Sequence, residues 1–494
     1  MTTPAMTTTT MTPTATNTNT NGSTRTEKDT MGEMQVPTDA LYGASTQRAV
    51  INFPVSGRPV PAAVIHAYGL LKSACAGVNK ELNLLDGNRA EAIANASREI
   101  AQGQHDAHFP IDIFQTGSGT STNMNANEVI ANLICLQRGA PIGSSKNAEY
   151  LEAGGVHPND HVNMGQSSND TFPTAMHIAS ALAISESLIP AVRQTAATLE
   201  DLAKRWDDVI KIGRTHMQDA TPIRLGQEFS GYAAQMRHAE ERLGQALAAL
   251  AHLPLGGTAV GTGINTHPEF GSRVASTLSK STGFHFQEAA NHFEAQHAKD
   301  AFVLASGVLK TVAVSLSKIA GDIRLMGCGP RCGIGELKLP AVQPGSSIMP
   351  GKVNPVICEA VVMVSCQVVG NDQAITLGAF GGVGSLLDLN VAMPMIADNL
   401  LSSVTLLTGA CNILNEKLLK GIEADVERCN ELIEGSLAMC TSLVPAIGYD
   451  KSAALAKQAF AEGKTVRQVA IEQGVLPEDE LNRLLDPAKM THPG

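Results

Sequence analysis

The chain has 494 residues, which at roughly 150 residues per domain predicts about three domains or one large fold of several parts. Its 47 acidic residues outnumber its 36 lysines and arginines, so the formal net charge is −11. A diffusely acidic chain without a basic block is a poor candidate for binding nucleic acid or anionic membranes, and 43% hydrophobic residues exclude wholesale disorder.

The composition favours long helices and a reducing compartment. Aromatic residues make up only 4%, so the core has to be built from alanine, leucine, isoleucine and valine, which suits closely packed helices. The nine cysteines are scattered and none stands in a CxxC pair, as is typical of a cytoplasmic protein. We expect no membrane span, because the most apolar stretch, residues 301–320, contains Lys310 and Lys318.

The chain begins with a stretch rich in Thr, Asn and Pro, residues 1–27, which offers little to bury. We predict that it is a disordered tail, and its single arginine argues against a targeting segment. Residues 28–165 mix helical patterns with turns and are predicted to form an N-terminal mixed helical domain. Helices are expected there over residues 61–83 and 88–102.

Further along the chain, apolar residues recur at helical spacing and predict five long helices, over residues 175–206, 224–250, 294–326, 354 to about 370, and 391–419. Pro190 should kink the first of these helices, and Asn354 should cap the fourth. We assign residues 166–424 to a central helix-bundle domain and residues 425–494 to a small C-terminal domain. The apolar stripes are wider than one bundle needs, so we expect helices of other subunits to pack on them.

Four loops between the helices are dense in Gly, Ser, Thr, Asn and His: residues 116–123, 166–171, 213–219 and 345–355. Each loop supplies hydroxyl, amide or backbone donors, which would bind an anion if they converged on one point. A single loop of this kind is better explained by helix capping. Four of them, one with His216 and one with Lys352, favour a shared anion site.

Other reaction chemistries lack their motifs. Residues 345–352 resemble a phosphate-binding loop, but five residues separate the glycines where four are required, and Val353 stands where Ser or Thr should hold magnesium. The sequence contains no HExxH or GxSxG and no GxGxxG after a predicted strand, and its histidines lack partners at zinc spacing. We therefore expect neither a metal nor an organic cofactor.

Residues 345–355, Gly-Ser-Ser-Ile-Met-Pro-Gly-Lys-Val-Asn-Pro, resemble the signature of the fumarase/aspartase superfamily, within which the chain is similar to class II fumarases. The resemblance runs from about Asp29 to the C-terminus. Further matching segments follow in the family's order: residues 30–33, 46–50, 115–120, 157–160, 166–174, 213–216 and 256–263. The family implies a mainly α, three-domain fold whose central long-helix bundle is completed by tetramerisation, with loops of three subunits in each active site.

The resemblance implies reversible hydration of fumarate to L-malate, a step of the tricarboxylic acid cycle, by anti addition and elimination of water. In the malate-to-fumarate direction a proton leaves a carbon beside a carboxylate, and the resulting aci-carboxylate needs electrostatic stabilisation, a base and an acid. By resemblance Ser346 is the base, acting as an alkoxide whose pKa is lowered by Lys352 and by N–H groups of the loop. His216, oriented by Glu359, handles the water.

The family's carboxylate-binding residues correspond to hydroxyl, amide and ammonium side chains of the four loops: Ser118, Thr120, Ser167, Ser168, Asn169, Thr215, Ser347, Lys352 and Asn354. His157, Asn159 and Asp160 match a second anion site near the active-site entrance. The basic residue that the family often carries just before that histidine is missing here, where Gly154 and Gly155 stand.

Two alternatives stay open. An aspartate ammonia-lyase or another carbon–nitrogen lyase of the superfamily generally has Gln in place of His216 and Ala in place of Gly351, and this chain has the fumarase residue at both positions. A structural protein recruited from the superfamily need not keep Ser346, Lys352 and His216 together. We expect a cytoplasmic homotetramer that acts on a small dicarboxylate and binds neither nucleic acid nor membrane.

Overall fold

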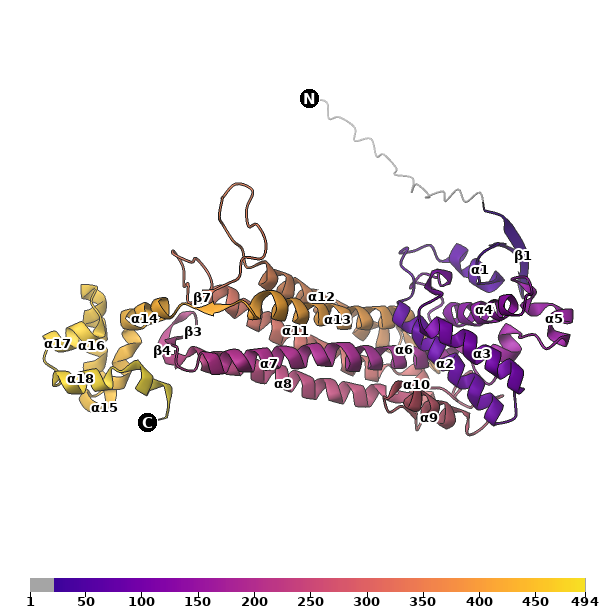
Figure 1. The fold of residues 1–494 in the computed structure, drawn as a ribbon. Coiled ribbons are helices and arrows are strands. Elements are labelled where there is room, and N and C mark those ends of the chain that lie inside the picture. Colours follow the sequence, from indigo (N-terminus) through magenta and orange to yellow (C-terminus); the bar gives the residue numbers. More distant parts are fainter. Residues whose placement is uncertain (1–21, 494) are drawn as a thin grey trace, which may run out of the picture.

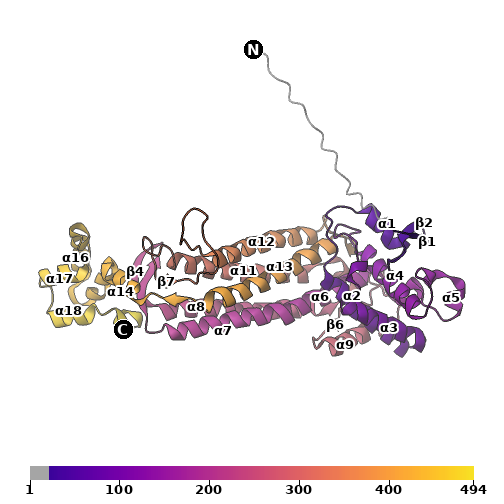
Figure 2. The same ribbon diagram turned by 45° about the horizontal axis from the view of Figure 1, so that its top comes forward.

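The computed structural model describes residues 22–493, which form an elongated molecule (Figure 1). The N-terminal region lies at one end, a bundle of long helices fills the middle, and the C-terminal helices lie at the other end. Figure 2 shows the same order along the long axis in a turned view. Helices dominate the described residues, and the prediction of a mainly α fold is confirmed.

The described part of the chain opens with an antiparallel hairpin of β1 (Thr24–Asp29) and β2 (Gly32–Pro37). Arg25 fixes it to the body of the protein, because its guanidinium donates hydrogen bonds to the carbonyl oxygens of Pro37 at 2.6 Å and Tyr42 at 2.7 Å. The prediction of a disordered tail over residues 1–27 is therefore wrong at its end, since residues 24–27 belong to β1. The part of that tail before residue 22 lies outside the described residues.

Five helices build the N-terminal region: α1 (Ala44–Asn52), α2 (Ala62–Glu81), α3 (Gly87–Ala101), α4 (Thr120–Gln137) and α5 (Ala148–Glu152). The helices expected over residues 61–83 and 88–102 are confirmed as α2 and α3. The side chain of Asp86 accepts a hydrogen bond from the Arg89 N–H and so caps α3. Buried Glu128 of α4 accepts hydrogen bonds from Gly43 and Thr46 at the start of α1, which ties the two helices together.

Six long helices form the bundle: α6 (Ser168–Ala183), α7 (Ile189–Arg205), α8 (Leu225–Leu250), α11 (Asp300–Met326), α12 (Val356–Ala379) and α13 (Met393–Ile413). Helices α7 and α8 pack along each other, as do α11 and α12 (Figure 2). Their shared stripes supply fully buried residues such as Leu199, Leu243, Leu309 and Leu407. The core of the bundle is continuous with that of the N-terminal region.

Two of the predicted long helices are interrupted near polar or proline residues. The helix expected over residues 175–206 begins earlier, at Ser168, and is broken by a π-helical turn at Ile184–Leu188, so that Pro190 falls in the first turn of α7. The helical backbone continues through this point, since Leu188 and Ile189 are both in the right-handed helical conformation, and the π-helical turn stands just before the proline, which has no N–H to donate. The helix expected over 294–326 is split into α10 (His292–His297) and α11, with Lys299 between them.

Two more boundaries differ from the expectation. Helix α13 covers only part of the helix predicted over residues 391–419 and passes into a π-helical turn at Leu414–Leu419. Helix α12 starts at Val356 and ends at Ala379, beyond the predicted end near residue 370. Asn354 does not cap it; its side-chain amide donates instead to the Gly345 carbonyl at 2.7 Å and closes the base of the 345–355 loop.

Short elements connect the helices. They are the hairpin of β3 (Ile210–Thr215) and β4 (Gln218–Arg224), the pairs β5 (His252–Leu253) with β6 (Gln287–Glu288), β7 (Leu337–Lys338) with β10 (Glu423–Ala424) and β8 (Ser385–Leu386) with β9 (Leu389–Asn390), and helix α9 (Phe270–Thr282).

The C-terminal region has a core of its own. It contains α14 (Val426–Gly435), α15 (Val444–Ile447), α16 (Tyr449–Glu462), α17 (Val466–Glu472) and α18 (Glu478–Leu484). Buried apolar side chains between Ile433 and Leu485 form a second cluster, separate from the main core.

Two stretches, Ser168–Arg205 and Asp300–Met326, are long and apolar enough to cross a membrane by length and composition. The second contains residues 301–320, in which the two lysines were expected to argue against a span, and the first was not considered. Within the chain, 61% and 56% of their most apolar windows are buried. Both stretches lie in the middle of the bundle, so their apolar residues are satisfied by neighbouring helices.

Candidate active site

The first helical turns of α4 and α6 meet at one end of the bundle and bring three predicted carboxylate-binding residues together. The Thr120 hydroxyl lies 2.8 Å from the Ser168 hydroxyl and 2.8 Å from that of Ser118. Gly119 makes this approach possible: its φ is 73°, and a Cβ atom there would stand 2.0 Å from the Phe172 ring. Two helix N-termini, each carrying a partial positive charge, are thereby placed side by side.

Ser167 and Asn169 complete this cluster and also have structural roles. The Ser167 hydroxyl accepts from the Asn169 N–H at 3.2 Å and caps α6, and the Asn169 side chain donates to the Ala259 carbonyl at 2.7 Å. The capping explanation therefore holds for Ser167, although its O–H remains able to donate.

Asp170 binds the glycine-rich loop 256–263 to this cluster. Its carboxylate accepts from the N–H groups of Ser167 at 2.9 Å, Gly256 at 3.2 Å and Thr258 at 2.9 Å. Burial raises the pKa of Asp170 to about 6, against the pull of these donors. The sequence analysis did not single out Asp170, although an Asp three residues after the Ser167 cap is the pattern of a capping box.

A cavity of about 440 Å³ lies in front of the two helix N-termini. Its wall contains no charged side chain and consists of Thr120, Asn123, Met124, Asn159, Asn163, Gly165, Gln166, Ser167, Ser168, Thr258, Ala259, Ile264 and Asn265. Neutral donors and two helix dipoles favour an anion with delocalised charge. The cavity also joins the predicted carboxylate-binding residues to Asn159 of the predicted second anion site.

His157 and Asp160 of that second site are engaged with each other. The His157 Nδ1 atom accepts from the N–H groups of Asn159 at 3.3 Å and Asp160 at 3.1 Å and caps the π-helical turn Pro158–Val162. Burial lowers the pKa of His157, which the nearby Asp160 carboxylate only partly offsets. Of the three predicted residues, only Asn159 lines the cavity. Anion binding by this group stays a prediction.

The predicted acid–base residue His216 lies at the opposite end of the bundle, in the two-residue turn between β3 and β4. His216 and its neighbour Met217 have φ values of 54° and 59°, a conformation that such turns usually give to Asn and Gly. Each costs a residue with a β-carbon roughly 1–2 kcal/mol. Both side chains are exposed, as is that of Thr215.

A buried ion pair holds the base of this hairpin. One guanidinium nitrogen of Arg214 lies 2.8 and 2.9 Å from the two carboxylate oxygens of Glu336, which is completely buried, and Lys211 Nζ lies 3.4 Å from it. Glu336 also accepts the Asp425 N–H through its backbone carbonyl and so joins the hairpin to the C-terminal region. No local sequence signal points to Glu336, because its partner Arg214 is 122 positions away.

The 345–355 loop projects from the side of the bundle between β7 and α12 (Figure 1). The Ser346 hydroxyl oxygen accepts from the N–H groups of Ile348 at 3.2 Å and Met349 at 3.0 Å. Two N–H donors on one oxygen stabilise negative charge there. Ser347 and Lys352 are exposed.

A single chain does not assemble all the predicted catalytic groups. Helix α8 connects the His216 hairpin to the segment that leads into loop 256–263, and its 26 residues at about 1.5 Å each separate the two ends by about 39 Å. Figure 1 shows β3 and β4 at one end of the bundle and α4 at the other. Glu359 is exposed in the first turn of α12, and among residues 22–493 no hydrogen bond joins it to His216.

Within the described part of the chain, no three His, Cys, Asp or Glu side chains gather closely enough to hold a metal ion. The nine cysteines are all free.

Comparison with known proteins decides the family. Residues 32–370 match the family described as "Lyase", and residues 439–492 match "Fumarase C C-terminus". The chain is 52% identical to "Fumarate hydratase class II" of Corynebacterium glutamicum, over 95% of this chain and 96% of that relative. The chain belongs to the class II fumarases. It is also 52% identical to the protein of the same description from Mycobacterium tuberculosis, over 94% of this chain and 95% of that one.

Solved structures agree with the class II fumarase assignment. Class II fumarase from Schistosoma mansoni is 38% identical with a TM-score of 0.90, and the match covers 95% of this chain and 99% of that one. A fumarate lyase:delta crystallin from Brucella melitensis, in a structure bound to cobalt, is 44% identical with a TM-score of 0.89 and coverages of 95% and 100%.

Proposed function

We propose that this enzyme catalyses the reversible hydration of fumarate to L-malate. The observation that carries the proposal is the uncharged cavity in front of the paired N-termini of α4 and α6, which suits one carboxylate group of a small dicarboxylate. The membership in the class II fumarases supplies the reaction. A carbon–nitrogen lyase is not favoured, because His216 and Gly351 are both the fumarase residues.

In the proposed mechanism Ser346 removes the proton from the carbon beside a carboxylate of malate. The N–H groups of Ile348 and Met349 already point at its oxygen and would stabilise the alkoxide. Lys352, six positions on in the same loop, would add a positive charge to both the alkoxide and the aci-carboxylate. Water exclusion when the loop covers the substrate would strengthen this attraction.

His216, oriented by Glu359, would protonate the leaving hydroxyl of malate or activate the water that adds to fumarate. Helix α8, about 39 Å long, separates the His216 hairpin from the cavity of the same chain. The histidine that acts at a given cavity therefore has to come from another subunit. We therefore propose a homotetramer in which the hairpin, the 345–355 loop and the cavity of a given site belong to three different chains.

Helix α12 supports the assembly. It exposes apolar side chains along its length on the sides away from the main core: Met363 is 67% exposed, Val369 38% and Leu377 53%. Exposed apolar side chains of this size are costly in water and suit packing against the same helix of other copies. We also propose that the enzyme is cytoplasmic and needs neither a metal nor an organic cofactor.

The test follows the absorbance of the fumarate double bond with the purified full-length chain. Fumarate should be consumed and L-malate should regenerate it, whereas L-aspartate should give no fumarate. Light scattering at the assay concentration should give about four times 51.7 kDa. Ammonia release from aspartate without hydration of fumarate would overturn the proposed reaction, and an active monomer would overturn the shared site.

A further inference from the structure

A completely buried lysine, Lys72 of α2, lies behind the wall of the cavity. Its ammonium group donates to the side-chain oxygens of Asn163 and Gln166, at 3.0 Å each. Both of these amides line the cavity. None of the ion pairs among the described residues includes Lys72, so a carboxylate does not neutralise it by direct contact.

The two amides are oriented by this ammonium group. The Asn163 NH₂ donates to the Gln166 carbonyl at 3.1 Å, and the Gln166 NH₂ donates to the backbone carbonyls of Val162 and Met164 at 3.1 Å each. The NH₂ group of each amide therefore donates away from Lys72 while its oxygen faces the ammonium group, which is the orientation that a positive charge requires.

Lys72 is also connected to the two helix N-termini that form the cavity. The Asn163 oxygen accepts two further hydrogen bonds from side chains of α4, from Asn123 in its first turn at 3.1 Å and from Asn127 at 3.3 Å. Gln166 directly precedes Ser167, the cap of α6. One buried cation thus holds the segments that carry Thr120 and Ser168.

The charge of Lys72 also contributes to the potential in the cavity. Because the wall has no charged side chain and the ammonium group lies outside solvent, little water or salt screens its charge from the cavity. The partial positive charges of α4 and α6 act in the same direction. Asp170 is the nearby opposing charge, but its carboxylate is occupied by three backbone N–H donors.

We propose that Lys72 is a positioning residue of the dicarboxylate site. It sets the amides of Asn163 and Gln166, and it supplies the fixed positive charge that makes the neutral cavity select dianions over monoanions. This inference rests on the proposed function, since it takes a dicarboxylate as the ligand.

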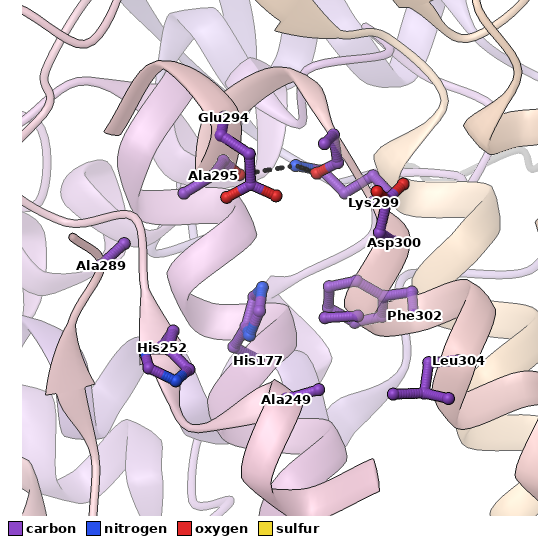
Figure 3. A pocket seen from close by; sticks show the side chains of 12 residues that line it. His177, Ala249, His252, Ala289, Glu294, Ala295, Lys299, Asp300, Phe302 and Leu304 are labelled. Atoms are coloured by element: carbon purple, nitrogen blue, oxygen red, sulfur yellow. Dashed lines mark hydrogen bonds between the residues drawn. The ribbon is translucent and has the colours of Figure 1, made fainter. Parts of the chain in front are cut away.

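The proposal is tested with Lys72→Met, which keeps the length of the side chain and removes its charge. Lys299→Met is the matched control: Lys299 is equally buried but lines a different cavity (Figure 3). Its ammonium group donates to the backbone carbonyls of Ala295, Gln296 and Ala298. Calorimetry at pH 7.0 measures the binding of succinate, an unreactive dianion, and of succinamate, the matching monoanion, to each full-length protein.

For Lys72→Met we expect the Kd of succinate to rise about 10- to 30-fold, because the loss of a buried positive charge weakens the attraction for both negative charges of the dianion. The Kd of succinamate should rise much less, about three- to five-fold, because that ligand carries half the charge. Lys299→Met should change both constants less than about twofold. An equal loss for the two ligands, or succinate binding unchanged in Lys72→Met, would overturn the proposal.

The wild-type protein provides a second test, which does not depend on how the variant folds. Burial lowers the pKa of Lys72 to about 8. The groups that face it titrate elsewhere: burial raises the pKa of Cys75 and Tyr68, on its own helix, far above that value, and the pKa of Asp170 on α6 is about 6. Succinate affinity should therefore fall above pH 8, by up to about tenfold per pH unit.

A succinate affinity that stays constant up to pH 9.5 would overturn the role of Lys72. The result is separable from the proposed function. If the protein hydrates fumarate but its succinate binding depends neither on Lys72→Met nor on pH, the proposed function stands and the positioning role of Lys72 is rejected. A wild-type protein that neither hydrates fumarate nor binds succinate rejects both.

Discussion

The two ends of the helix bundle are built in opposite ways. At the cavity end, Thr120, Ser168 and Asp170 lie in a dense hydrogen-bond network between helix N-termini, and a buried Lys72 stands behind them. At the other end and on the side of the bundle, the proposed reacting groups occupy an exposed turn and an exposed loop. Under the proposed mechanism, substrate recognition therefore lies on rigid elements, and the chemistry lies on exposed segments that another subunit would complete.

The largest expected effect is that of Ser346→Ala, which should separate chemistry from recognition. Turnover should fall by about 10²–10⁴, the usual contribution of a positioned base, while succinate binding changes less than about threefold. Steady-state kinetics and calorimetry on the assembled protein measure the two quantities. Ser230→Ala, an exposed serine of α8, is the matched control and should behave as wild type. Turnover above about a tenth of wild type would rule out Ser346 as the base.

Glu336→Gln should destabilise the hairpin that carries His216, because it removes the carboxylate that binds Arg214 at the base of the hairpin. The change removes the counter-ion of Arg214, whereas Lys211 keeps its closer partner Glu228 at 3.0 Å, and the loss should cost about 3 kcal/mol of unfolding free energy. We expect kcat to fall while the Kd of succinate stays within about twofold, because the cavity lies at the other end of α8. Chemical denaturation and kinetics give both readouts.

Glu241→Gln is the control for that substitution, since its partner His238 is exposed and the pair should contribute less than about 0.5 kcal/mol. If succinate affinity in Glu336→Gln fell by the same factor as kcat, the buried ion pair would support the whole molecule and not only the hairpin.

Met217→Gly should reveal the strain in the His216 turn. A glycine accepts the positive φ without penalty, so the free energy of unfolding should rise by about 0.5–1 kcal/mol, after the entropy that a glycine adds to the unfolded chain. Turnover should fall a few-fold because the turn then holds His216 less firmly. Leu387→Gly relieves a comparable φ of 50° at an exposed position and should leave turnover unchanged. The absence of any gain in stability would mean that the turn is not strained.

The smallest effects concern the N-terminus. Deleting residues 1–21 is expected to change neither turnover nor thermal stability. Deleting residues 1–27 removes most of β1 and the hydrogen bonds of Arg25, and should lower the unfolding free energy by about 1–3 kcal/mol. Thermal unfolding of the two truncated proteins, side by side, distinguishes the dispensable stretch from the folded hairpin.

The elements that could be predicted are those whose cause is local. Helix α8 was predicted within one residue at its start because its apolar residues recur every three or four positions without interruption. The capping of α6 by Ser167 was not predicted, because the helix was expected to begin only at residue 175, although the residue type favours a cap at that position.

The features that escaped prediction depend on partners far along the chain. Arg25 looked like part of a polar tail because the carbonyl groups that it binds lie 12 and 17 positions on. Glu336 and Arg214 are 122 positions apart, and Lys72 meets Asn163 across 91 positions. The π-helical turn at 184–188 escaped because it alters hydrogen bonding without altering the apolar pattern.

Helix α8 acts as a rigid strut between an acid–base residue and a binding cavity that belong to the same chain, and this has a consequence for dilution. In the proposed assembly, a separated subunit cannot bring its own His216 to its own cavity. Specific activity should therefore disappear as the protein is diluted below the dissociation constant of the assembly. For the same reason, two inactive variants damaged at opposite ends of the strut should restore activity when their subunits are mixed, because some of the hybrid sites then draw only on undamaged segments.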